Sequence, residues 1–109
     1  MVPDGVVAQR TLDFSGDPNR KVTVLIKHPT PDGDDYRCGY EIIGLNDGKT
    51  RSSYAMGSDS MQALMLALKM IGTDLYTSDA FKEGRLSLDG SRNLDFPVPD
   101  VIADLVPKD

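Results

Sequence analysis

Apolar positions crowd into one stretch of the chain, residues 57–72, where they recur with helical spacing. Two adjacent stripes cover most of the circumference: Met61, Leu64, Leu68 and Ile71 in the first, and Ala63, Leu66, Ala67 and Met70 in the second. Only Gln62 and Lys69 interrupt them, so the pattern predicts a central helix with most of its surface buried. Asp59 is the expected N-cap, and Gln62 is spaced to return a capping bond to the backbone N–H of Asp59.

Before this helix, apolar and polar residues alternate with the period of two that is typical of β-strands. The alternation predicts strands over residues 6–14, 21–28, 36–44 and 50–56, and residues 29–35 are expected to form a polar loop that contains two prolines. Short connections join antiparallel neighbours, whereas parallel strands need long crossovers. The four strands therefore predict an antiparallel meander.

Two alternatives stay open at Gly72, because the helix either ends there or continues through residues 73–76. Ser78 is the expected cap of a further single turn over Asp79–Lys82, and residues 85–88 alternate as a short edge strand does. The prolines near the end of the chain predict extended backbone. Pro99 is also suited to open a final helical turn.

These elements together predict the fold class α+β, an antiparallel four- to five-stranded meander sheet packed against one main apolar helix. At 109 residues, the chain has the length of one compact domain. We expect a single α+β domain over residues 1–109, with loose ends at residues 1–5 and 106–109.

Charge and hydropathy narrow the classes of partner. The net charge is −5, from 17 acidic and 12 basic residues, so the surface repels phosphate backbones and nucleic-acid binding is not expected. Such a charge favours solubility or steering toward a basic partner. The longest apolar run is shorter than the roughly 20 residues of a membrane span, and the sequence does not open on a secretory signal. We therefore expect no membrane association, and we expect a cytoplasmic location.

Two stretches resemble a family of small bacterial proteins known only as a domain of unknown function. They are residues 36–45 (Tyr-Arg-Cys-Gly-Tyr-Glu-Ile-Ile-Gly-Leu) and residues 57–72. Residues 84–86 and 94–97 are similar to the closing segment of that family. The resemblance implies a compact, bacterial, cytoplasmic domain, and it implies no catalytic residue, cofactor or partner.

The single histidine and the single cysteine are the first candidates for chemistry. His28 and Cys38 fall on adjacent predicted strands, and a thiolate–imidazole pair is a nucleophile in some enzymes. Such a pair also needs a third group that orients the base, and none is evident here, so no catalytic residue is predicted. Cys38 alternates with Tyr36 and Tyr40, as a small core residue does.

Metal and cofactor motifs are incomplete. Asp32, Asp34 and Asp35 have neither the spacing of a calcium loop nor its closing glutamate, and one cysteine with one histidine does not complete a zinc site. The triplet Gly48-Lys49-Thr50 lacks the earlier glycine of a phosphate-binding loop, because position 43 is Ile43. We expect no metal and no cofactor.

The leading functional prediction is a non-enzymatic domain that acts through protein–protein contact, with a second copy of itself or with an unknown protein. An immunity- or antitoxin-like role suits an acidic surface. A helix that is apolar on nearly all sides needs a second cover, either the C-terminal segment or another subunit, and the C-terminal segment is favoured. The alternative is a small-molecule binder or enzyme with a pocket between sheet and helix, near His28, Tyr36, Cys38 and Tyr40.

Overall fold

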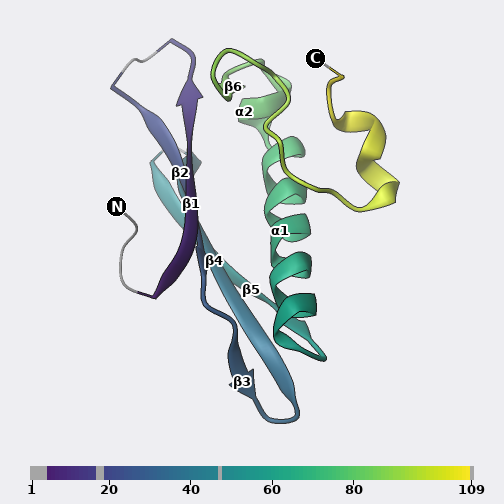
Figure 1. Ribbon diagram of the computed structural model, residues 1–109. Helices are drawn as coiled ribbons and strands as arrows, with labels where there is room; N and C mark the ends of the chain where they lie inside the picture. Colours follow the sequence, from purple (N-terminus) through teal and green to yellow (C-terminus); the bar gives the residue numbers. More distant parts are fainter. Residues whose placement is uncertain (1–4, 17–18, 47, 109) are drawn as a thin grey trace.

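The computed structural model describes residues 5–16, 19–46 and 48–108 as a sheet layered against a helix (Figure 1). In chain order the elements are β1 (Val6–Phe14), β2 (Lys21–Lys27), β3 (Thr30–Asp32), β4 (Asp35–Asn46), β5 (Lys49–Gly57), α1 (Ser60–Tyr76), α2 (Asp79–Lys82), β6 (Leu86–Ser87) and the 3-10 helix η1 (Asp100–Leu105). The α+β fold is confirmed, and residues 1–4 and 109 of the expected loose ends lie outside the described residues.

All pairings between neighbouring strands of the sheet are antiparallel. β2 and β3 follow one another along one edge of β4, while β5 pairs with the other edge, and β1 and then β6 continue the sheet beyond β2. The predicted meander is therefore correct. The sheet has six strands in place of the predicted four or five.

The additional strand, β3, lies where a polar loop was expected. Its three residues pair with β4, Pro31 opposite Tyr36, and Gly33 closes the turn between the two strands with a positive φ of 64°. All three residues of β3 are exposed. The loop prediction was wrong there because a strand with no buried side shows no apolar alternation.

Helix α1 begins as predicted. The Asp59 side chain accepts a hydrogen bond from the backbone N–H of Gln62 at 2.7 Å. The side chain of Gln62 reaches one residue further back than expected, and its Oε1 accepts from the backbone N–H of Ser58 at 2.6 Å. The helix continues past Gly72 to Tyr76, so Gly72 is not a stop.

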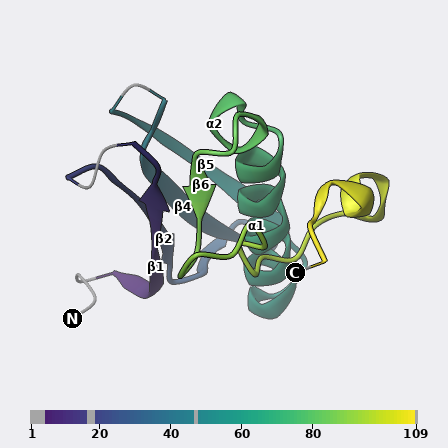
Figure 2. The ribbon, with the colours of Figure 1, turned by 90° about the horizontal axis from the view of Figure 1, so that it is seen from above.

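Gly72 instead marks a close approach between α1 and the C-terminal segment, which leaves β6 and crosses the helix toward η1 (Figures 1 and 2). A Cβ atom at residue 72 would overlap the carbonyl oxygen of Pro97 and would lie 3.0 Å from Cγ1 of Val98. Leu94 is fully buried in the same segment, and Phe96 and Val98 pack against the core. This is the C-terminal cover that the sequence favoured.

The core lies between α1 and the inner face of the sheet. On β2 and β4 the buried side chains alternate as predicted: Val22, Val24 and Ile26, then Cys38, Tyr40 and Ile42. On α1 a row of buried side chains recurs every fourth residue, at Ala63, Ala67, Ile71 and Leu75, and Tyr76 is buried beside the last of them. The sequence predicted that most of the helix surface is buried. This prediction is wrong for the first half of α1, where the side chain of Met61 is 69% exposed and that of Met65 is 53% exposed.

The end of the chain combines both predicted conformations, because extended chain leads through Pro99 into η1. None of the residues of η1 is buried. Val106, within the expected loose end, packs partly against the core, and the backbone oxygen of Pro107 accepts a hydrogen bond from Nδ2 of Asn93 at 3.1 Å.

Candidate functional site

The four residues proposed from the sequence as pocket candidates are divided between different environments. Cys38 and Tyr40 lie on the inner face of β4 and are buried, and Tyr36 is half-buried against the core. His28 follows the end of β2 and is exposed, and its backbone N–H donates to the oxygen of Gly5 at 3.0 Å.

Cys38 has the surroundings of a structural thiol. Its Sγ is 3.3 Å from the backbone oxygen of Lys27, to which it donates. Burial raises the pKa of the Cys38 thiol above its usual value. A nucleophilic cysteine needs the reverse, a lowered pKa and access to solvent. The thiol is therefore protonated at neutral pH and unsuited to attack a substrate.

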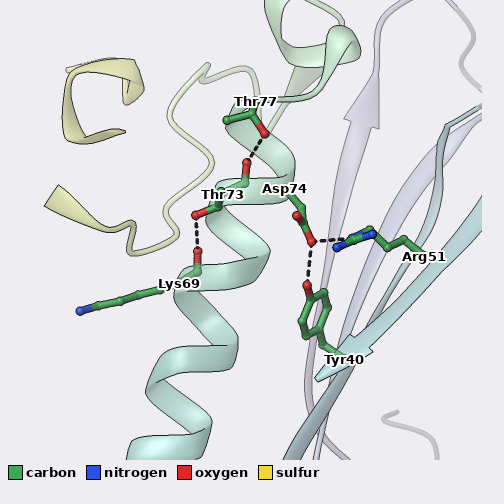
Figure 3. A network of polar contacts seen from close by, with 6 residues as sticks. All are labelled: Tyr40, Arg51, Lys69, Thr73, Asp74 and Thr77. Carbon is green, nitrogen blue, oxygen red and sulfur yellow. Dashed lines mark hydrogen bonds and ion pairs between the residues drawn. The ribbon is translucent and has the colours of Figure 1, made fainter. Parts of the chain in front are cut away.

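Tyr40 belongs to a polar network that links the helix to the sheet (Figure 3). Its hydroxyl donates to Oδ2 of Asp74 at 2.7 Å, and Nε of Arg51 donates to the same oxygen at 2.8 Å. Burial, followed by the hydrogen bond to Asp74, raises the pKa of Tyr40. The network fixes α1 against β4 and β5, and sequence spacing carries no signal for it because its three members lie on three different elements.

A hollow opens on the outer face of the sheet, the face opposite α1. Its volume is about 570 Å³, and it is lined by Gly5, Lys27, His28, Thr30, Arg37, Gly39, Tyr40, Ser52, Ser53 and Tyr54. His28 lines this hollow, whereas the sequence placed the candidate pocket between the sheet and the helix. The thiol of Cys38 and the ring of Tyr40 point to the inner face, so these candidates do not converge on one pocket between sheet and helix.

A second, mostly apolar cavity lies between α1 and the inner faces of β1 and β2. We call it the apolar groove: it has a volume of about 240 Å³ and is lined by Ala8, Gln9, Arg10, Val24, Ile26, Leu68, Ile71, Asp95, Phe96 and Pro97. It exists because α1 lies mainly over β4 and β5, which leaves the inner face of β1 and β2 to the C-terminal segment.

Arg10 anchors the rim of the apolar groove. Its Nη1 donates to the backbone oxygens of Leu94 at 3.2 Å and Asp95 at 2.7 Å, and its guanidinium carbon is 4.9 Å from the centre of the Phe96 ring. These contacts hold the C-terminal segment to β1. The groove is consequently a built feature with an apolar floor and polar groups at its edge.

Two exposed methionines lie on the same side of α1 as Leu68. Met61 and Met65 precede Leu68 at i, i+4 and i+7 spacing, so the three side chains share one side of the helix. Leu68 lines the apolar groove, whereas Met61 and Met65 line a separate shallow hollow with Gln62, Leu66 and Lys69, toward the start of α1 from the close approach at Gly72. We call Met61 and Met65 the methionine strip.

Two further features bear on the kind of site. Across residues 5–16, 19–46 and 48–108, no cluster of three or more histidine, cysteine, aspartate or glutamate side chains is arranged to hold a metal ion. Among the described helices, none has the length and apolar character needed to cross a membrane.

Comparison with known proteins gives one match. The model of a family described as "Domain of unknown function (DUF6968)" matches residues 8–98. That range contains the sheet from Ala8 onward, both α-helices and the segment that covers Gly72, and it ends just before η1. No curated protein and no solved structure matches the chain.

Proposed function

Because the chain belongs to the DUF6968 family, whose function is unknown, we propose from its own surface that it is a non-enzymatic protein–protein interaction domain. The proposed contact surface is the apolar groove together with the methionine strip. The partner contributes an apolar segment, such as one face of an amphipathic helix, that lies along α1.

The observation that carries this proposal is the exposure of Met61 and Met65 on the side of α1 that also carries Leu68, a lining residue of the apolar groove. Single exposed apolar residues are ordinary, but here two large ones lie one turn apart and precede Leu68 on one side of the helix. Apolar side chains at i, i+4 and i+7 spacing form the face with which an amphipathic helix commonly binds an apolar groove. Methionine is flexible and polarizable, so it adapts to the side chains of a partner.

The net charge of −5 favours a partner whose surface is basic around its apolar contacts. An immunity- or antitoxin-like domain in the cytoplasm is one role in which a basic partner is expected. In the second form of the proposal, the partner is another copy of this chain, and a homodimer forms through the same surface. The protonated, buried thiol of Cys38 supports a role without nucleophilic catalysis.

The test is affinity capture of the tagged protein from its native cells, with mass spectrometry of the proteins that remain bound. We expect one stoichiometric partner with the wild-type chain, and loss of that partner with the double variant Met61→Glu/Met65→Glu. Light scattering of the purified protein separates self-association from binding of a different chain.

Val101→Glu is the matched control, because Val101 is 87% exposed and lies in η1, outside the proposed contact surface. It should retain the partner, and both variants should melt at the wild-type temperature, since the substituted side chains lie on the surface. Capture of the chain alone, combined with a monomer in light scattering, would contradict the proposal.

A further inference from the structure

The outer face of the sheet carries a second feature, independent of the proposed contact surface. Gly39 lies in the interior of β4 and places no side chain on this face. An added Cβ atom there would lie 3.5 Å from Cδ of Lys27 and 3.8 Å from the backbone oxygen of Ser53, both ordinary contacts. The glycine is thus part of the floor of the 570 Å³ hollow, which falls within the range of small-molecule sites.

The charge of this hollow is opposite to that of the chain. Three basic residues line it (Lys27, His28 and Arg37), and no aspartate or glutamate within residues 5–16, 19–46 and 48–108 is among its lining residues. The chain as a whole has 17 acidic residues against 12 basic ones. Glu41 supplies a counter-charge to one of them, since its Oε2 is 3.0 Å from Nζ of Lys27. The carboxylate of Glu41 therefore neutralises Lys27 and leaves the guanidinium of Arg37 as the charge available to a ligand.

Arg37 is held in a conformation that suits anion binding. Its guanidinium carbon lies 3.8 Å from the centre of the Tyr54 ring, so the flat face of the guanidinium is occupied by the aromatic ring. The N–H groups of a guanidinium point outward in its plane, and this is the edge that binds carboxylate or phosphate oxygens in pairs. Within the described part of the chain, no carboxylate forms an ion pair with Arg37.

We propose that the hollow over Gly39 binds the carboxylate or phosphate group of a small anionic ligand. Arg37, oriented by Tyr54, donates to two oxygens of the anion. His28, Thr30 and Ser52, which also line the hollow, offer further hydrogen-bonding side chains, and Lys27 lines it while paired with Glu41. The lack of a side chain at position 39 gives the ligand access to the floor between these groups.

The experiment is a titration of the ¹⁵N-labelled protein with inorganic phosphate and, separately, with succinate, at constant ionic strength in sodium chloride. We expect saturable shifts of the backbone amide signals of residues 37–39 and 54 with at least one of the two anions. Tighter binding of phosphate would indicate a phosphate ligand, and tighter binding of succinate would indicate a carboxylate ligand.

Two variants test the site by different means. Arg37→Gln should weaken binding about tenfold or more, the usual loss for a hydrogen bond to a charged group. Gly39→Val fills the floor without changing any charge, and it should also abolish the saturable shifts. If Gly39→Val fails to fold, Arg37→Gln alone decides the outcome.

Lys21→Gln is the matched control. Lys21 lies at the far end of β2, where its Nζ is 2.6 Å from Oδ1 of Asp13, so the substitution removes the same charge outside the hollow. It should bind as the wild type does. Shifts that never saturate, or an affinity that falls equally in Lys21→Gln and Arg37→Gln, would show general ionic attraction and overturn the proposal.

Discussion

At the scale of single residues, the hydroxyl of Tyr40 is a polar group that the core accommodates through a partner on another element. The residue is 1% exposed, and the hydroxyl depends on Asp74 on α1 for its hydrogen bond. Burial and the neighbouring carboxylate both raise the pKa of Tyr40 above its usual value near 10. The folded state therefore holds the phenolic proton more tightly than the unfolded chain does.

This difference predicts a loss of stability in alkali. A group whose pKa is raised on folding contributes its full stability below the unfolded pKa, and that contribution is lost as the pH rises through the folded pKa. The melting temperature of the wild type should fall as the pH rises above about 10. Tyr40→Phe, which cannot ionise, should show a smaller fall, measured by circular dichroism melts at a series of pH values.

Tyr54→Phe is the control for this experiment, because Tyr54 is an exposed tyrosine on the outer face of the sheet. Its alkaline melting curve should follow that of the wild type. Equal alkaline losses in the wild type and in Tyr40→Phe would show that Tyr40 does not carry the effect.

At the scale of elements, the sequence predicted the features that depend on near neighbours. The cap at Asp59 and the buried alternation of β2 and β4 are local patterns, and both are present in the structure. The apolar pattern of residues 57–72 did not show which side of α1 stays exposed to solvent, because this exposure depends on the path of the C-terminal segment. The apolar groove and the network around Asp74 likewise join residues far apart in the chain, so no spacing rule reveals them.

Gly72 illustrates the difference between local and tertiary requirements. Alanine at this position favours the helix by about 1 kcal/mol in isolation. Its Cβ atom would nevertheless overlap the oxygen of Pro97 and force the C-terminal segment outward. We predict that Gly72→Ala lowers the free energy of unfolding by about 1–3 kcal/mol, the usual effect of overpacking.

Urea denaturation measures this effect directly. Met61→Ala is the control within the same helix, since the side chain of Met61 is mostly exposed, and its substitution should change stability by less than about 0.5 kcal/mol. A Gly72→Ala variant more stable than the wild type would mean that the segment around Pro97 does not pack on α1 as described.

At the scale of the whole molecule, the packed body and the family match end at the same place. The match stops at residue 98, and the residues that cover α1 from the C-terminal side are Leu94, Phe96 and Val98. Beyond them, η1 buries no residue, and the contacts of Val106 and Pro107 are partial. The fold should therefore depend on residues 94–98 and only weakly on the chain beyond Val98.

Two truncations separate these contributions. A chain that ends after Val98 should fold and lose about 1 kcal/mol of stability, because it loses only partly buried contacts. A chain that ends after Asn93 lacks Leu94, which is 0% exposed, and uncovers Gly72. Loss of one fully buried leucine side chain alone costs about 2–5 kcal/mol, a large part of the stability of a small domain, so this chain should unfold. Thermal melts and the dispersion of amide NMR signals show whether each truncated chain is folded. An unfolded 1–98 chain would show that η1 completes the core.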